Sequence, residues 1–409
     1  MYIASARRTD LAVPKTGTGR VAANVVALGV VSLVTDISSE MVTAVLPLYL
    51  VLGLGFSPLQ FGLLDGLYSG VTAFVRIAGG NLADRFQRRK LVAGIGYGVS
   101  AVAKLGLLAA GSSAAALGLV LAADRTGKGL RTAPRDALIS LSSEPSALGR
   151  AFGVHRAMDT VGAFLGPLVA FGLLWTVAGG YDAVFFTSFC FAVLGVVLLV
   201  LFVRDKREAV PAKAAVSMRA AVGLLRDRSL RRVCLWAVAL GLVTVGDGFV
   251  FLLLQSRLEI PAAYVALLPL GTAGVYLLLA VPIGLVADRV GRWRMFLCGH
   301  LALLLAYAAL LGAVDGFLLL GFVVLAHGAF YAATDGVLMA AAGPLVPSAL
   351  RTSGLAVLQT GQAVARLCSS VLFGALWTGF GQGVAIGCAV GGLGLVVVLA
   401  FARPLREVP

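Results

Sequence analysis

The chain has 409 residues, of which 59% are hydrophobic and 13% are charged, and its mean hydropathy is +0.97. A soluble domain carries about a quarter charged residues, so this composition excludes a soluble enzyme, a disordered chain and a secreted disulfide scaffold. The formal charge of +14 does not indicate a nucleic-acid partner, because the basic residues lie at the edges of apolar segments. The sequence therefore predicts a protein whose surroundings are the lipid bilayer.

Apolar segments long enough to cross a bilayer recur along the whole chain. A span needs about 20 predominantly apolar residues, and most of the segments are joined by short loops. The predicted spans are 22–52, 58–82, 91–111, 114–138, 150–176, 182–203, 233–256, 262–286, 295–313, 316–341, 350–377 and 383–402. They predict an all-α membrane protein with twelve transmembrane helices in two pseudo-symmetric six-helix bundles.

The distribution of basic residues predicts the orientation of the chain. Segments on one side of the spans are rich in Lys and Arg, whereas the loops on the other side contain only Arg257. By the positive-inside rule, both termini are cytoplasmic, and the short loops and small apolar residues are typical of a bacterial inner-membrane protein. The predicted parts are a cytoplasmic arm (1–21), a bundle (22–203), a cytoplasmic linker (204–232), a second bundle (233–402) and a cytoplasmic tail (403–409).

A short pattern of glycine, aspartate and arginine occurs once in each half, at the end of the second span. Here the chain resembles the major facilitator superfamily, whose loop between spans 2 and 3 carries Gly-x-x-x-Asp-Arg-x-Gly-Arg. The first copy has Gln87 where glycine is usual, and the second copy keeps Gly291. The resemblance implies a conformational latch, although the charges could instead only fix the topology. The latch residues are Gly80, Asp84, Arg85 and Arg88 in the first copy and Gly284, Asp288, Arg289 and Arg292 in the second.

Two further elements resemble motifs of the same superfamily. Asp124-Arg125 is similar to its span-4 arginine motif. Gly162, Gly166 and Pro167 resemble the Gly-x-x-x-Gly-Pro motif of its antiporter-type members. Glycines permit close helix approach and proline removes a backbone hydrogen bond, so the second element is expected to act as a hinge in span 5. It favours export by exchange, and the alternative interpretation is a plain packing motif.

Carboxylates within the spans are the candidates for proton coupling. Asp36 and Glu40 lie one helical turn apart, and two acids that are desolvated together favour retention of a proton by one of them. The alternative interpretation is a set of ion pairs between helices, namely Glu40 or Asp36 with Arg125, Asp65 with Arg76, and Asp335 with Arg366. The coupling candidates are Asp36, Glu40, Asp65, Asp124 and Asp159.

The residues expected to line a substrate cavity come from both halves. Intramembrane polar side chains are costly, and they therefore face partners or water rather than lipid. The candidates are Asp36, Glu40, Arg125, His155, Asp247, His327, Tyr331, Asp335 and Gln359. No cofactor and no metal site is expected, because the three histidines and five cysteines lack metal-ligand spacing.

These features predict a proton-coupled secondary active transporter that moves a small organic solute by alternating access between two bundles. The proton gradient supplies the energy. Export or antiport is the favoured direction, and the alternative is import of a metabolite, a metal ion or a metal chelate. An enzyme is disfavoured, because neither His-Glu-x-x-His nor Gly-x-Ser-x-Gly occurs. The family resemblance implies a monomer.

Overall fold

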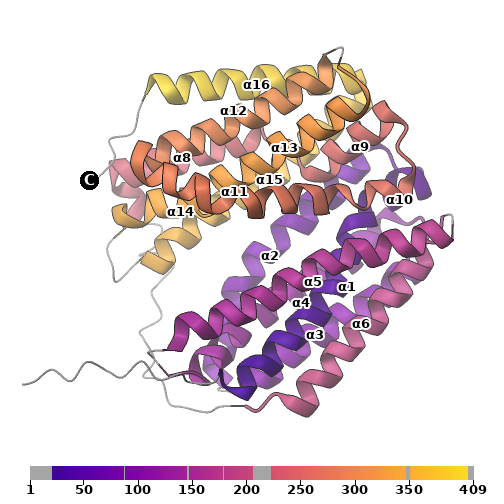
Figure 1. Ribbon diagram of the computed structural model, residues 1–409, viewed down its shortest axis with the longest axis vertical. Helices are drawn as coiled ribbons and strands as arrows, with labels where there is room; N and C mark the ends of the chain where they lie inside the picture. Colours follow the sequence, from indigo (N-terminus) through magenta and orange to yellow (C-terminus); the bar gives the residue numbers. More distant parts are fainter. Residues whose placement is uncertain are drawn as a thin grey trace, which may run out of the picture.

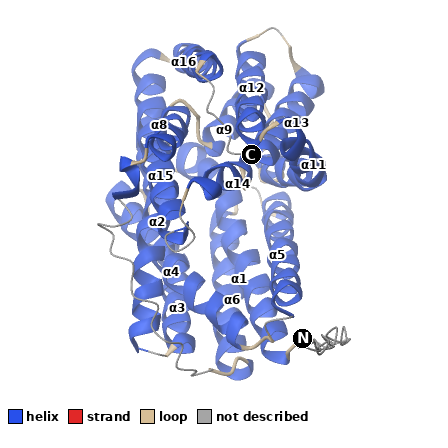
Figure 2. Cartoon of the chain, turned by 90° about the vertical axis from the view of Figure 1, so that its left-hand side faces the viewer, coloured by secondary structure: helices blue, strands red, loops and turns tan. Residues whose placement is uncertain are grey.

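The computed structural model consists of helices joined by loops, and no strand occurs among the residues it describes (Figure 2). The described residues are 21–86, 88–144, 147–177, 179–205, 223–312, 314–346 and 351–403. Side chains within 73–74, 76–87 and 351–353 are outside this description, as are most of the predicted arm, linker and tail. The predicted all-α fold is confirmed.

Six helices form the first bundle. Their apolar sequences carry prolines without interruption of the helix, for example Pro47, Pro134 and Pro167. A π-helical segment, Tyr49–Gly53, continues the first helix. The helices are α1 (Ala23–Leu48), α2 (Pro58–Phe86), α3 (Arg89–Ala109), α4 (Ala114–Leu141), α5 (Leu148–Thr176) and α6 (Tyr181–Phe202).

The second bundle differs because three of its predicted spans are interrupted. The interruptions lie at 243–246, at 266–267 and at Asp335–Gly336, where Gly336 has a φ of 77°. Glycine adopts this left-handed conformation without steric cost, which lets the chain leave the helix there. The helices are α8 (Arg228–Leu242), α9 (Asp247–Leu258), α10 (Ala262–Val265), α11 (Leu268–Val290), α12 (Arg292–Leu311), α13 (Gly316–Thr334), α14 (Val337–Ala342), α15 (Arg351–Phe380) and α16 (Gln382–Ala402).

Ten helical segments among the described residues are long and apolar enough to cross a membrane. Helices α2 and α4 have comparable lengths, 29 and 28 residues, but are not among these ten. Charged residues lower their hydropathy, and in α4 these include Asp124, Arg125, Lys128 and Arg131. The chain is therefore a multi-pass membrane protein whose charged groups are concentrated in a few spans.

The two bundles lie side by side and diverge toward one end (Figure 1). We call this the terminal end, because α1 and α8 begin there and α6 and α16 end there. The side chain of Asn24 bonds to Ser142 at 2.7 Å and to the Arg204 carbonyl at 3.2 Å, which ties α1, α4 and the end of α6 together at this end. The opposite end, which carries α10, is called the distal end.

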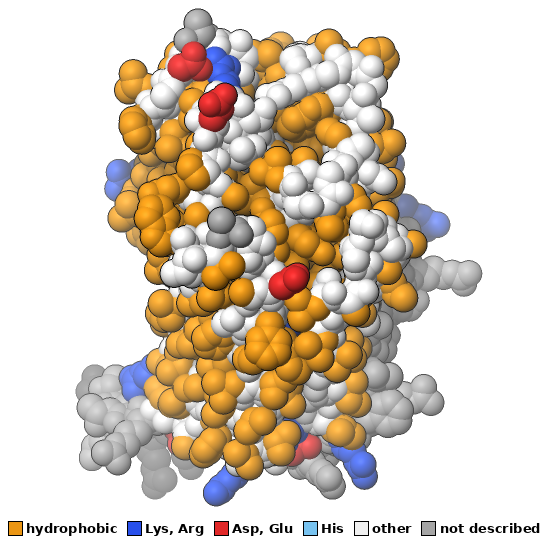
Figure 3. Space-filling view, turned by 90° about the vertical axis from the view of Figure 1, so that its right-hand side faces the viewer, with side chains coloured by type: hydrophobic (Ala, Val, Ile, Leu, Met, Phe, Trp, Pro, Cys, Tyr) orange, Lys and Arg blue, Asp and Glu red, His pale blue; other side chains and the backbone are white. Residues whose placement is uncertain are grey.

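The bundles are in direct contact toward the distal end. A methyl group at Gly62 of α2 would overlap the Ser370 carbonyl of α15, and one at Gly374 of α15 would lie 3.0 Å from Cα of Leu59. The rings of Phe61 and Phe249 pack edge to face at 4.7 Å. Figure 3 shows the distal end as a continuous, mostly apolar surface with few charged side chains. The bundles are therefore closed against each other on this side.

The predicted span-5 hinge lies where α5 crosses α1. A methyl group at Gly162 would overlap the Leu33 carbonyl, and one at Gly166 would lie 2.9 Å from the Ile37 carbonyl. Both glycines are buried, as is Pro167. The motif thus brings two backbones of the same bundle into contact, which is the packing role left open by the sequence.

We expect Gly162→Leu to destabilise the first bundle. The added side chain would meet the α1 backbone, and overpacking of this kind costs about 1–3 kcal/mol. The measurement is the thermal unfolding midpoint of the purified protein in detergent. Gly172→Leu is the matched control, because a methyl group there meets nothing within 4 Å. Equal midpoints for the two variants would contradict the proposed contact.

Candidate functional site

A cavity lies between the bundles and consists of two adjoining chambers. The chamber nearer the distal end has a volume of about 400 Å³, and the chamber nearer the terminal end has a volume of about 490 Å³. Helices of both bundles line each chamber, which is the layout of a substrate site at the interface of two repeats. The residues common to both chambers are Tyr68, Ser69, Thr244, Tyr331, Asp335 and Arg366.

Charged side chains are unevenly divided between the chambers. Glu40, Asp65 and Asp247 line only the distal chamber. Arg125 and Lys128 line only the terminal chamber. The cavity is thus acidic toward the distal end and basic toward the terminal end, with Asp335 and Arg366 at the boundary.

An acidic cluster of the second bundle is built on the break between α8 and α9. The break makes Asp247 the first residue of α9, where the helix dipole favours a carboxylate. The Tyr331 hydroxyl donates to Asp247 at 2.6 Å, and His327 Nε2 lies 3.3 Å from it. The His327 and Tyr331 rings stack at 5.4 Å, and His327 Nδ1 is buried with no hydrogen-bond partner among the described residues.

Asp65 connects the bundles across the cavity. The Ser370 hydroxyl of α15 donates to the Asp65 carboxylate of α2 at 2.5 Å. A methyl group on Gly246, which precedes Asp247, would lie 2.9 Å from Asp65 Oδ2. The Asp65 carboxylate of the first bundle therefore lies against the Ser370 hydroxyl and the Gly246 backbone of the second bundle.

Arg366 lines both chambers, yet it forms no hydrogen bond or ion pair with any residue that the structure describes. It faces Tyr331, Asp247, Asp335 and Asp65 at longer range, and it is exposed in the cavity. Among the described residues, the hydrogen-bond partner of the Asp335 side chain is the Tyr276 hydroxyl, which donates to it at 3.5 Å. The alternative interpretation, an ion pair of Asp335 with Arg366, is therefore not what the structure shows.

The span-4 arginine belongs to a buried ion cluster of the first bundle. Asp124 accepts from Lys104 at 2.5 Å and from Arg125 at 2.6 Å. The Arg125 guanidinium lies 3.7 Å from the centre of the Tyr68 ring, whose hydroxyl is 2.8 Å from Thr43 Oγ1. The sequence also left open an ion pair of Arg125 with Asp36 or Glu40. This alternative is wrong, because the Arg125 guanidinium pairs with the carboxylate of Asp124 instead.

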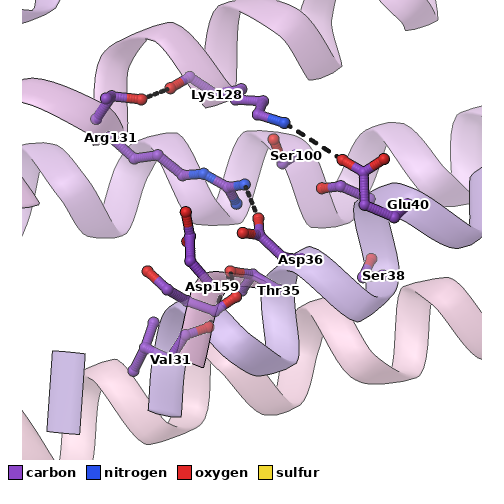
Figure 4. A network of polar contacts seen from close by, with 12 residues as sticks. Val31, Thr35, Asp36, Ser38, Glu40, Ser100, Lys128, Arg131 and Asp159 are labelled. Carbon is purple, nitrogen blue, oxygen red and sulfur yellow. Dashed lines mark hydrogen bonds and ion pairs between the residues drawn. The ribbon is translucent and has the colours of Figure 1, made fainter. Parts of the chain in front are cut away.

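The acids of α1 pair with the next turns of α4 (Figure 4). Glu40 lies 3.7 Å from Lys128, and Asp36 lies 3.7 Å from Arg131. Asp159 of α5 lies beside Asp36 within hydrogen-bonding reach. These residues form a polar layer between α1, α4 and α5, and Glu40 and Lys128 are its members on the cavity wall.

The polar layer continues toward the terminal end. Arg135 lies 3.8 Å from Asp159 and donates to Ser32 at 3.2 Å. The Ser32 hydroxyl is 2.9 Å from His155 Nε2, and His155 is buried. His155 thus serves the interior of the first bundle.

The structure divides the candidate residues between the wall and the protein interior. Those on the wall are Glu40, Asp65, Arg125, Asp247, Tyr331, Asp335 and Gln359. Those behind it are Asp36, Asp124, Asp159, His155 and His327. Sequence reasoning missed Tyr276 and Ser370, because a single hydroxyl in an apolar span gives no signal of its own.

The two latch segments are described to different extents. The surroundings of Gly80 and the side chains of Asp84 and Arg85 lie outside the described part. Arg88 is exposed just before α3. In the second copy Asp288 pairs with Arg292 at 2.9 Å, and Arg292 also donates to the Ala340 carbonyl of α14 at 3.0 Å. Gly284 and Arg289 precede this contact in α11. The second copy therefore joins α11, α12 and α14 within one bundle.

The described residues contain no group of three His, Cys, Asp or Glu side chains arranged to hold a metal ion. The five cysteines are free thiols at separate positions. The chemistry that the described cavity offers is charge pairing and hydrogen bonding, which suits binding of a polar solute.

Two helical bundles around a charged central cavity are the architecture of secondary membrane transporters. A sequence model of the Major Facilitator Superfamily matches residues 28–275, and the chain belongs to this superfamily. An uncharacterized MFS-type transporter of Methanocaldococcus jannaschii is 29% identical over 364 residues, which cover 87% of this chain and 88% of the relative. The protein is a transporter and not an enzyme.

Solved structures share the fold. A mutant of the nucleoside transporter NupG superposes with a TM-score of 0.81 at 16% identity, covering 93% of this chain and 98% of that one. A mutant of a peptide transporter POT gives 0.73 at 15% identity, covering 93% and 94%. At these identities the likeness establishes the architecture alone.

We expect Asp124→Asn to destabilise the protein strongly. The change leaves Lys104 and Arg125 buried without a counter-charge, and breaking a buried pair in this way costs about 3–5 kcal/mol. Thermal unfolding of the purified variant measures the effect, with Asp136→Asn as the control because Asp136 is half-exposed beside Arg135. Adding Lys104→Met should recover part of the loss. An Asp124→Asn variant as stable as the control would show that the cluster is not needed for folding.

Proposed function

We propose that the protein is a proton-coupled secondary transporter of a small organic solute. The observation that carries this proposal is the charged cavity between the bundles, which is lined from both sides and closed toward the distal end. Alternating access needs a site that each state exposes to one side of the membrane. The terminal end is assigned to the cytoplasm of a cell inner membrane, because the basic residues gather on that side.

Glu40 is the proposed coupling residue on the cavity wall. Its carboxylate lies 3.7 Å from Lys128, a distance at which a proton on the carboxylate removes the attraction between the two side chains. Both side chains are partly exposed, 28% for Glu40 and 31% for Lys128, so water and substrate reach them. Asp36 and Asp159 lie behind Glu40 in the same polar layer and are the next candidates to receive the proton.

The proposed direction is export in exchange for protons, by one solute-binding cavity that serves both states. The Gly-x-x-x-Gly-Pro element that favoured exchange packs α5 on α1, so it supports export only through the family resemblance. Import on the same scaffold is the alternative. A monomer with lipid as its surroundings suffices, because one chain supplies both walls of the cavity.

The test uses purified protein in liposomes that enclose a pH-sensitive dye. The challenge is a panel of cationic drugs, organic anions, amino acids, sugars, metal chelates and metal ions. We expect a compound-dependent proton flux whose sign distinguishes exchange from co-transport. If a compound is transported and no compound in the panel changes the proton flux, proton coupling is contradicted.

Glu40→Gln should abolish the compound-dependent proton flux while the protein still binds the compound. The substitution keeps the size of the side chain and removes its charge and its titration. Glu259→Gln is the matched control, because Glu259 caps α9 at the exposed distal surface away from the cavity. Unchanged flux in Glu40→Gln would remove this residue from the coupling role.

A further inference from the structure

The fixed charges of the cavity do not all neutralise one another. Glu40 has Lys128 as its partner, and Arg125 has Asp124. After these pairs are set aside, the wall still presents Asp65, Asp247 and Asp335 together with Arg366. Both signs of charge therefore remain for a bound molecule to pair with.

Arg366 has the largest unused hydrogen-bonding capacity on the wall. It lies on α15 at the boundary of the chambers, is exposed there, and bonds to no described residue. A guanidinium presents five N–H donors in a planar fork that matches a carboxylate. A charge within a membrane span is costly unless a partner satisfies it, so this fork points to an anionic group on the solute.

Asp335 and Asp247 offer the opposite charge beside it. Asp335 follows the last residue of α13 at the helix break and is exposed in the cavity. Within the described part of the chain, its side chain has only the 3.5 Å contact with Tyr276. The side chain of Asp247 is 48% exposed although Tyr331 and His327 contact it. Both carboxylates retain lone pairs that face the cavity and can accept from an ammonium group.

We propose that the cavity takes a zwitterionic solute, with a carboxylate held by Arg366 and an ammonium group held by Asp335 and Asp247. This inference rests on the proposed function, since it names the substrate class of the same cavity. A solute with one charge would leave either the guanidinium or the carboxylates without a partner, and unpaired groups in a site discriminate strongly against such a ligand. Chambers of about 400 and 490 Å³ admit a small organic molecule.

The first test compares matched compounds for binding to the purified full-length protein. The zwitterions are γ-aminobutyrate, ε-aminocaproate and ω-aminocaprylate, and each is compared with the fatty acid and the alkylamine of the same length. We expect at least one zwitterion to raise the unfolding temperature with an apparent affinity at least about tenfold above both singly charged analogues. Equal shifts for an analogue at every length, or no shift by any zwitterion, would overturn the inference.

The second test uses two variants with opposite expected effects. In Arg366→Gln the advantage of the zwitterion over the alkylamine should disappear, and in Asp335→Asn its advantage over the fatty acid should disappear. This crossed pattern does not arise from a general loss of stability. Arg366→Lys keeps the charge without the fork and should fall between wild type and Arg366→Gln. Arg231→Gln is the control, because Arg231 is exposed in the first turn of α8 and outside the cavity.

The assignment of the two charges would be contradicted if each variant lost the preference for the zwitterion over both the alkylamine and the fatty acid. It would also be contradicted if neither variant lost either preference. The liposome assay separates this failure from failure of the proposed function. Proton flux driven by a singly charged compound, with no zwitterion bound, removes the inference and leaves proton-coupled transport intact. Crossed binding of the zwitterions without any proton flux upholds the inference and removes the coupling.

Discussion

The structure depends on how buried charge is satisfied within the membrane. Each charged side chain in the centre of a span costs about 2.5–3.5 kcal/mol on insertion scales, so it is retained only where partners or water meet it. In the first bundle, α4 supplies Arg125, Lys128 and Arg131 in successive turns, and acids on α4 and α1 receive them. The position of α4 against α1 is therefore fixed by charge as well as by shape.

The second bundle uses its charges differently. Its acids stand at interruptions of helices, where Asp247 begins α9 and Asp335 ends α13, and hydroxyl groups contact them more closely than cations do. Broken helices are tolerated inside a membrane where they line a cavity, since the freed backbone groups find partners there. The ion pairs of the cavity wall thus belong to the first bundle, and most of its available charges belong to the second bundle.

Much of this architecture could be predicted from the sequence. Hydropathy, the positive charges between spans and the repeated Asp-Arg pattern indicated the spans and two halves, because each is a local property of the chain. The helix breaks were not predicted, since Val243 to Gly246 is apolar and reads as a continuous span. The pairing of Arg125 with Asp124 was also missed, and so was the lack of any described partner for Arg366, because ion pairing depends on the rotation and depth of each helix, which hydropathy does not encode.

The limit for the site is clearest at the glycines. Gly162 and Gly166 matched a motif of antiporter-type family members. In the structure, both glycines lie where the backbones of α5 and α1 cross. A sequence motif shows which residue types recur in a family, whereas the contacts of a residue in the structure indicate its role. The same distinction separates Glu40 from Asp36, which share a helix face in the sequence but lie on and behind the cavity wall in the structure.

The uneven placement of helix breaks gives the molecule an uneven stiffness. The helices of the first bundle run uninterrupted and are linked by ion pairs, so this half is expected to resist bending. The second half has joints within three of its spans, and the joints at 243–246 and at Asp335–Gly336 line the cavity. Bending is therefore expected to be concentrated in that half, where Asp247 and Asp335 stand at two of the joints and line the cavity. Binding in the cavity and bending of these spans are therefore expected to be coupled.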